Sequence, residues 1–171
     1  HKFHTGRVLA ISAVHFVHDC YTSFLAPALP LIIEKMGFSY GLTGLLAVFQ
    51  RIPSLFNPLI GIVAERPVMR YMVIFSPALT ALFMSLIGIA PGYVFLAVLL
   101  FFSGISSTLW HIPSPVMVKS LAGKRTGMGM SIYMAGGELA RTAGPLIILG
   151  VISLWGLEGT WKMMPFGLAA S

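Results

Sequence analysis

Two histidines and an aspartate lie within five residues of one another, at His15, His18 and Asp19, in the stretch AVHFVHDCYTSFLAPALP. Each of these side chains can bind and release a proton, yet the surrounding run is hydrophobic and long enough to cross a bilayer. An ionised side chain at the bilayer centre costs at least about 2.5–3.5 kcal/mol, so such residues indicate a functional position. We therefore predict a proton-coupling role for Asp19, with His15 and His18 beside it.

A metal site is the competing interpretation of this stretch, because Cys20 directly follows Asp19. The spacing of His15, His18 and Cys20 matches no zinc-binding pattern. Cys20 is the single cysteine of the chain, which excludes an intrachain disulfide and a multi-cysteine metal site. We expect no metal and no cofactor.

Three further ionisable residues interrupt hydrophobic runs elsewhere: Arg51, Glu138 and Arg141. Counted from the ends of the expected spans, Asp19, Arg51 and Glu138 each lie about twelve residues deep, which is about 18 Å at 1.5 Å per residue. All three would lie near the bilayer centre, with Arg141 one turn further out. Because charged groups avoid lipid, we expect these side chains to meet one another or to line water. Glu138 is the second proton-coupling candidate.

The arginines are candidates for holding a substrate, because a guanidinium group can grip a phosphonate or a carboxylate with two hydrogen bonds. The candidate substrate-binding residues are Arg51, Arg141, His111, Gln50 and Asn57. Two alternatives stay open. Arg51 and Arg141 could form purely structural ion pairs with Asp19 and Glu138, and His111 could simply hydrogen-bond a neighbouring helix.

Composition places all these residues in a membrane. The chain is 57% hydrophobic and 9% charged, with a mean hydropathy of +0.89, whereas soluble domains carry about 25% charged residues. Five runs are long enough to span a bilayer, at about 7–33, 39–64, 71–90, 93–118 and 126–156. A sixth begins near 162 and is cut off at Ser171. The sequence therefore predicts an all-α membrane protein with five complete transmembrane helices and a truncated sixth.

The positive charges predict the orientation, because cytoplasmic loops carry an excess of Lys and Arg. If the N-terminus is cytoplasmic, the inner segments hold seven basic residues and the outer loops hold Lys35 and Lys162. The inner residues are Lys2, Arg7, Arg66, Arg70, Lys119, Lys124 and Arg125. The net charge of +6 therefore reflects topology, and we expect no nucleic-acid partner.

Two segments resemble signatures of the major facilitator superfamily. GIVAERPVMR resembles the loop motif G-x-x-x-D-R-x-G-R-K between the second and third helices, with Gly61, Arg66 and Arg70 matching and Glu65 replacing the Asp. The resemblance implies a gating role for this loop. GGELARTAGPLIILG is similar to the antiporter signature G-x-x-x-G-P-x-x-G-G, and Gly144 and Pro145 match it.

Four further segments resemble the fosmidomycin-resistance branch of that superfamily. Its patterns H-x-x-x-D with P-x-L-P and F-Q…P-x-x-G are present in HFVHDCYTSFLAPALP and FQRIPSLFNPLIG. GISSTLWHIPSP is similar to G-x-x-S-x-x-F-H-P, although Trp110 replaces Phe and Ile112 is inserted before the proline. GKRTGMGMSIYMAGGE is similar to the next motif, but Glu138 replaces its final Asn.

The resemblance implies a transporter of twelve helices in two halves, with the substrate near the midplane. This chain would be the N-terminal half, working with a C-terminal half in the plasma (inner) membrane of a prokaryote. The expected function is proton-coupled efflux of small polar or anionic molecules, including drugs, by antiport and alternating access, with antibiotic resistance as a consequence.

Two alternatives to efflux remain at this point. The chain could belong to an uptake carrier of the same superfamily, or it could be a half-length scaffold or partner subunit without transport activity. An enzyme is not expected, because no Ser–His–Asp order and no H-E-x-x-H motif is present.

Overall fold

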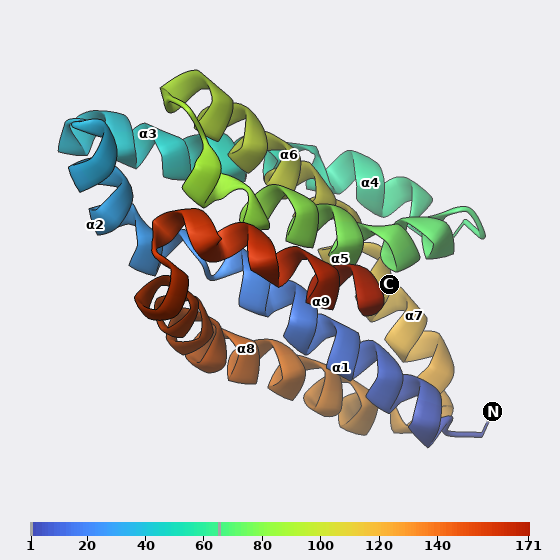
Figure 1. Cartoon of the computed structure of the whole chain (residues 1–171). Helices are drawn as coiled ribbons and strands as arrows, with labels where there is room; N and C mark the ends of the chain where they lie inside the picture. The colour runs from blue at the N-terminus through green and yellow to red at the C-terminus, as the bar shows by residue number, and fades with distance from the viewer. Residues whose placement is uncertain (1, 65) are drawn as a thin grey trace.

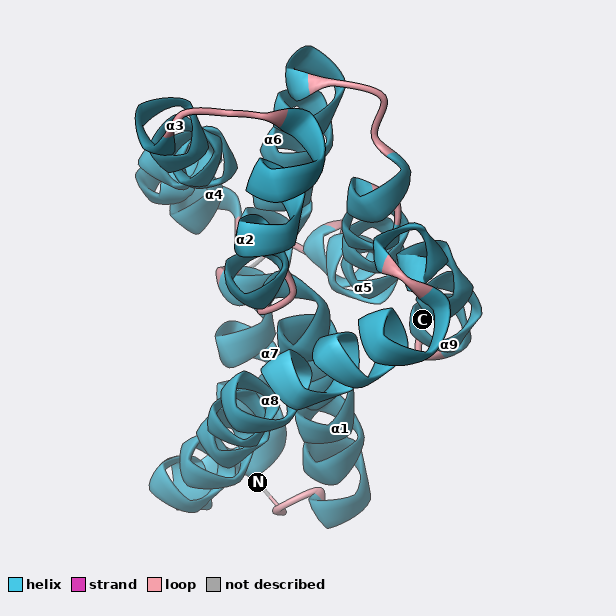
Figure 2. Ribbon diagram, turned by 60° about the vertical axis from the view of Figure 1, so that its left-hand side comes forward, coloured by secondary structure: helices cyan, strands magenta, loops and turns pink. Residues whose placement is uncertain are grey.

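The computed structural model describes residues 2–64 and 66–171, and these residues form helices joined by short turns (Figures 1 and 2). Figure 1 follows the chain from the blue N-terminal helix to the red C-terminal one. The elements in order are α1 Thr5–Thr22, α2 Leu25–Met36, α3 Tyr40–Arg51, η1 Ile52–Phe56, α4 Asn57–Val63, α5 Met69–Ser85, η2 Ile87–Ile89, α6 Tyr93–His111, α7 Pro113–Ala122, η3 Gly123–Arg125, α8 Thr126–Trp155, η4 Leu157–Met163 and α9 Met164–Ala169.

Prolines divide three of the predicted spans. The first run is split into α1 and α2 shortly before Pro27, whose missing N–H cannot bond the Ser23 carbonyl. The second changes from α3 to a 3₁₀ turn at Pro53, and the fourth breaks at Ile112, directly before Pro113. The side chains of Thr22 and Ser23 both donate to the Asp19 carbonyl at the first break, at 3.0 and 2.7 Å. Two hydroxyl groups therefore share one carbonyl in the last turn of α1.

Four stretches are long and apolar enough to cross a membrane: Thr5–Met36, Tyr40–Val63, Met69–Ile89 and Tyr93–Trp155. The last has 63 residues and would be about 95 Å long as a single helix, three times the thickness of the hydrocarbon core. It contains α6, α7 and α8, and α7 contacts α8, so this stretch crosses more than once. An all-helical membrane protein is confirmed, and the count of six crossings stays a prediction.

Among the described helices, α1 and α8 pack together most extensively, and they lie side by side in both views (Figures 1 and 2). Small residues on α8 permit this approach. A Cβ added at Gly136 would lie 2.4 Å from the Ser12 carbonyl oxygen, closer than real Cβ contacts allow. The same pair of helices carries Asp19 and Glu138, so their packing positions the candidate residues.

Basic residues gather at one end of the bundle. Lys2, Lys124 and Arg125 line a shared cavity there, and the backbone N–H of His4 bonds the Leu121 carbonyl. The opposite end, where α8 finishes in Figure 1, carries an ion pair in which Lys35 Nζ lies 2.8 Å from Glu158 Oε1. The separation of basic residues agrees with the predicted loop assignment. Which end faces the cytoplasm stays a prediction.

Candidate functional site

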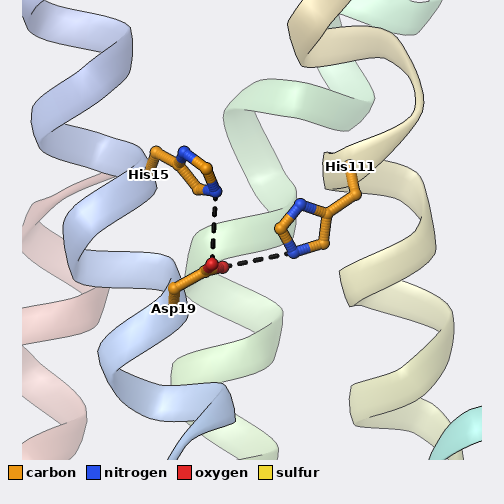
Figure 3. Close-up of side chains that lie close together, drawn as sticks. All are labelled: His15, Asp19 and His111. Carbon is orange, nitrogen blue, oxygen red and sulfur yellow. Dashed lines mark ion pairs between the residues drawn. The ribbon is translucent and has the colours of Figure 1, made fainter. Parts of the chain in front are cut away.

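Asp19 is buried and contacts three histidines, His15, His18 and His111. Figure 3 draws His15 and His111 beside it, and the His111 side chain is 37% exposed. The Asp19 carboxylate is 2.9 Å from His18 Nδ1, 3.2 Å from His15 Nε2 and 3.2 Å from His111 Nε2. His15 and His18 lie on α1, the helix that also carries Asp19. His15 is four residues before Asp19 and so lies on the same helical face, and His18 directly precedes Asp19. His111 is the last residue of α6 and approaches from across the bundle. Only 3% of Asp19 is exposed.

His15 is held in place by α8. Its Nδ1 lies 2.8 Å from the Tyr133 carbonyl oxygen, and the Tyr133 ring stacks on the imidazole at 4.0 Å between centroids. His15 Nε2 is within ion-pair distance of Asp19 but lacks hydrogen-bond alignment, so this nitrogen is buried without a hydrogen-bond partner. The imidazole is therefore held at one face and one edge by Tyr133, and its Nε2 stays without a hydrogen-bond partner near the carboxylate.

His18 is fully buried and connects Asp19 to α5 and α6. Its Nδ1 bonds Asp19, and its Nε2 lies 3.1 Å from Thr80 Oγ1. Thr80 Oγ1 lies 2.7 Å from Ser106 Oγ, which donates to the Ser103 carbonyl at 2.9 Å. A hydroxyl has one hydrogen, so when Ser106 donates to the Ser103 carbonyl, Thr80 donates to Ser106 and its oxygen accepts from His18 Nε2.

Four predicted residues line one cavity with Asp19. This cavity has a volume of about 350 Å³. Its lining comes from α1, α3, η1, α6 and α8, and consists of Asp19, Thr22, Ser23, Gln50, Arg51, Ser54, Gly104, Ser107, Thr108, His111 and Arg141. Gln50, Arg51, His111 and Arg141 therefore share a polar space with the buried carboxylate.

Four predicted coupling or binding residues lie outside that lining: His15 and His18, which are buried against Asp19, and Glu138 and Asn57. Glu138 Oε1 accepts from Arg141 Nη1 at 2.7 Å, and both side chains are more than half exposed. Within residues 2–64 and 66–171, no ion pair joins Asp19 to Arg51. The structure thus contains one of the two proposed ion pairs, and the histidines replace Arg51 as partners of Asp19.

The predicted gating and antiporter residues lie elsewhere. Arg66 and Arg70 line a separate cavity of about 850 Å³ with Lys119 and Lys124. Gly61 lies in α4, and Glu65 falls outside the described residues. In α8, Gly144 packs against α1: a Cβ there would lie 2.8 Å from the Cys20 carbonyl oxygen. Pro145 is accommodated inside the same helix.

The ligand atoms of His15, Asp19 and His111 lie within 4.8 Å of one another, a spacing that one metal ion could bridge. This group differs from the His15, His18 and Cys20 set considered from the sequence. Cys20 Sγ instead approaches the Ala140 carbonyl at 3.9 Å. At Asp19 Oδ1, His18 makes a hydrogen bond and His111 Nε2 lies within ion-pair distance at 3.2 Å.

Sequence reasoning missed the residues that support the histidines: Thr80, Ser106, Trp110 and Tyr133. The Trp110 ring stacks on His18 at 5.4 Å between centroids. Thr80 and Ser106 could have been identified only weakly from the sequence, as neutral polar residues within the apolar helices α5 and α6. Tyr133 acts through its backbone carbonyl, which the sequence does not distinguish from any other.

A transmembrane helical bundle with a polar cavity and buried ionisable residues is the architecture of a membrane carrier. The family model of the Major Facilitator Superfamily matches residues 11–171, and the chain belongs to this family of transporters, whose members are generally not enzymes.

Two curated proteins are similar to the chain. The uncharacterised MFS-type transporter YfnC of Bacillus subtilis (strain 168) is 23% identical over 166 residues, which cover 95% of this chain and 40% of that protein. The fosmidomycin resistance protein of Escherichia coli (strain K12) is 27% identical over 154 residues, which cover 88% of this chain and 37% of that protein. The chain thus spans about two fifths of the length of these relatives. No solved structure gave a significant match.

Proposed function

We propose that this chain is the N-terminal half of a secondary active transporter that exports small polar or anionic molecules in exchange for protons, by alternating access. The observation that carries the proposal is the shared cavity: the Asp19 carboxylate, the His111 imidazole and two guanidinium groups line one polar space. A C-terminal half would complete this space, because superfamily members bind their substrates between two halves. The resemblance to the fosmidomycin-resistance branch supports an anionic phosphonate as one exported compound.

The geometry supports separate roles for the two kinds of residue. Asp19 contacts only histidines among its ion-pair partners in the described chain, so its change of charge would be felt first by these imidazole rings. Arg51 and Arg141 stay charged at any physiological pH, and neither is ion-paired with Asp19 among the described residues. Arg141 is paired with the exposed Glu138, so Arg51 is the guanidinium group more readily available to an anion in the cavity, with Gln50 and His111 supplying further hydrogen bonds.

The loop residues support a gating role at the basic end of the bundle. Arg66, Arg70, Lys119 and Lys124 line one open cavity, so four cations converge there. Their mutual repulsion would favour the arrival of negative groups, such as the carbonyl ends of helices from the C-terminal half. We place this end in the cytoplasm, with the N-terminus.

The test uses the full-length protein in proteoliposomes loaded with fosmidomycin, with transport driven by a pH gradient. Asp19→Asn should abolish pH-driven export but leave binding of the drug intact, because the cavity keeps both arginines. Arg51→Gln should weaken drug binding by about tenfold or more, since a charge-assisted pair is worth about 1.5–3 kcal/mol. Glu158→Gln, at the far end of the bundle, is the matched control and should transport normally.

Two results would contradict the proposal. Undiminished pH-driven export by Asp19→Asn would remove Asp19 from coupling, and normal drug affinity in Arg51→Gln would remove the anion-binding role. If the pH gradient drove the drug into the proteoliposomes rather than out of them, the protein would be an uptake carrier.

A further inference from the structure

Two histidines on different helices direct a nitrogen toward the Asp19 carboxylate (Figure 3). His15 Nε2 lies 3.2 Å from Oδ2, and His111 Nε2 lies 3.2 Å from Oδ1. The ligand atoms of the three residues all lie within 4.8 Å of one another. Two ligand atoms bonded at about 2.1 Å to a tetrahedral metal ion are about 3.4 Å apart. Each histidine contact therefore has the spacing of two neighbouring ligands on one ion.

His15 has an unused lone pair beside the carboxylate. A backbone carbonyl oxygen only accepts, so His15 Nδ1, at 2.8 Å from the Tyr133 oxygen, carries the hydrogen of the neutral ring. Nε2 then keeps its lone pair, and this buried nitrogen has no hydrogen-bond partner in the described part of the chain. Metal-binding histidines almost always donate their other N–H to a carbonyl or a carboxylate in this way. The stacked Tyr133 ring fixes the orientation of the imidazole before an ion arrives.

The other two residues border the cavity. Asp19 and His111 both line the space of about 350 Å³, and the His111 side chain is 37% exposed. His111 is the last residue of α6, directly before the break at Ile112. A partly exposed side chain at a helix end has room to turn toward His15 and to close the group around an ion. A fourth coordination position would then face the cavity, where water or a small anion completes the shell.

We propose that His15, Asp19 and His111 bind one divalent transition-metal cation of borderline softness, such as Zn²⁺ or Co²⁺, and that the bound ion blocks transport. Two imidazoles and one carboxylate suit these ions, whereas Mg²⁺ and Ca²⁺ prefer shells made of oxygen. The sequence predicted no metal here because His111 is 92 residues from Asp19, and only the fold brings the two together.

The blocking role rests on the proposed function, whereas the binding of the ion does not. An ion held by this group occupies the carboxylate that we assign to proton coupling. It also occupies His111, which we assign to the substrate. Both assigned tasks would therefore stop while the ion stays bound.

The surrounding charges admit a cation that brings an anion with it. A divalent ion on one carboxylate and two neutral imidazoles leaves a net charge of +1, and a monovalent anion in the fourth position cancels it. Arg51 and Arg141 line the same cavity and favour that anion. His18 Nδ1 bonds Asp19 Oδ1 at 2.9 Å, so a further residue holds the carboxylate in place. Such supporting hydrogen bonds are typical of residues behind metal ligands.

Gly137 on α8 keeps the space beside the ligands open. A Cβ at this position would lie 2.8 Å from His15 Nε2 and 3.2 Å from Asp19 Oδ2. Gly137→Ala should therefore weaken metal binding although all three ligands remain. Gly150 on the same helix has open space around its Cβ position, so Gly150→Ala is the matched control.

The direct test titrates Co²⁺ into the full-length transporter in nanodiscs, purified without a polyhistidine tag, and follows the visible absorption of the bound ion. One Co²⁺ per protein should bind at micromolar concentrations, and excess Mg²⁺ should not displace it. His111→Ala should weaken binding by at least tenfold, since even the residues behind metal ligands contribute about 10–100-fold. His4→Ala removes an exposed histidine outside the group and should bind Co²⁺ like the wild type.

Two results of this titration would overturn the site. One is the absence of stoichiometric Co²⁺ binding by the wild type. The other is unchanged affinity in both His111→Ala and Gly137→Ala, with thermal unfolding in metal-free buffer showing that each variant is folded. Weaker binding by Gly137→Ala and normal binding by Gly150→Ala would support the site without removal of any ligand.

The functional test adds Zn²⁺ to the transport assay, with the free concentration held by a metal buffer so that chelation by the drug does not change it. Micromolar free Zn²⁺ should stop pH-driven export by the wild type. In His111→Ala the same inhibition, relative to the rate of that variant without metal, should need at least tenfold more Zn²⁺. Export that continues with the site filled would overturn the blocking role. If the protein exports nothing even without metal, the proposed function fails, and Co²⁺ binding still decides the metal site.

Discussion

Asp19 and Glu138 are carboxylates that the sequence places at the same depth of the membrane, but the structure gives them opposite surroundings. Asp19 is buried among three histidines from two helices. Glu138 is mostly exposed and bonds one arginine from its own helix, a turn away. Depth in the membrane therefore does not establish a coupling site. The distinction comes from whether partners on other helices enclose the charge, because only then does a change of protonation alter helix packing.

The largest expected difference between these regions is in stability. Asp19→Leu should lower the free energy of unfolding by about 3–5 kcal/mol, because it strips a common acceptor from three histidines in a buried site. Thermal unfolding of the purified full-length transporter measures this loss. Asp19→Asn, which keeps hydrogen-bonding groups, should recover most of it. Equal stability of Asp19→Leu and wild type would show that the cluster contributes nothing to packing.

The supporting hydroxyl chain gives an intermediate effect. Thr80→Val leaves His18 Nε2 buried without a partner, which should cost about 1–3 kcal/mol. Thr80→Ser preserves the hydroxyl and should stay within about 1 kcal/mol of the wild type. The same unfolding assay distinguishes the two variants. If Val and Ser behave alike at this position, the hydroxyl has no role in holding His18.

A smaller effect is expected for the exposed pair. Glu138→Gln should change stability by less than about 1 kcal/mol, because solvent screens an ion pair in which both side chains are more than half exposed. High salt should reduce even this difference. A loss comparable to that of Asp19→Leu would mean that the two carboxylates are equivalent, contrary to the comparison above.

The smallest effect belongs to the ion pair at the far end of the bundle. The hydrogen bond from Lys35, followed by its charge, lowers the pKa of Glu158 from its ordinary value. A carboxylate with a lowered folded-state pKa adds stability above its unfolded pKa, and this contribution is lost as the pH falls through the folded value. The melting temperature of Glu158→Gln should therefore lie slightly below wild type at pH 7 and converge with it in acid. Divergence in acid would contradict this assignment.

Much of the fold could be predicted from the lengths of the hydrophobic runs and from the positions of the prolines. The hydrophobic runs predicted each helical stretch, and Pro27, Pro53 and Pro113 accompany three breaks. Pro77 and Pro145 lie inside continuous helices, however. A proline removes one hydrogen bond, and whether the helix then breaks depends on neighbouring helices that replace the lost contact. Sequence alone does not carry that information.

The site was predictable where its residues share a helix. His15, His18 and Asp19 are related by helical spacing, so their proximity needs no tertiary information. His111 is 92 residues from Asp19 in sequence, and only packing brings α6 to α1. The sequence offered Arg51 as a partner of Asp19 from charge alone, but three histidines satisfy the carboxylate. The bond between His15 and the Tyr133 carbonyl could not be predicted for a different reason. Every residue has a backbone carbonyl, and only the fold determines which one lies beside His15.

The break between α1 and α2 separates the helix that carries Asp19 from the helix that follows it. It lies one turn beyond Asp19, and the partners of the carboxylate are on α1 and α6 rather than on α2. A rotation at Ser23 and Phe24 would therefore swing Leu25–Met36 without stretching any of the three histidine contacts. The first hydrophobic stretch is thus jointed: Leu25–Met36 can change its angle to α1 while Asp19 and its three histidines keep their geometry.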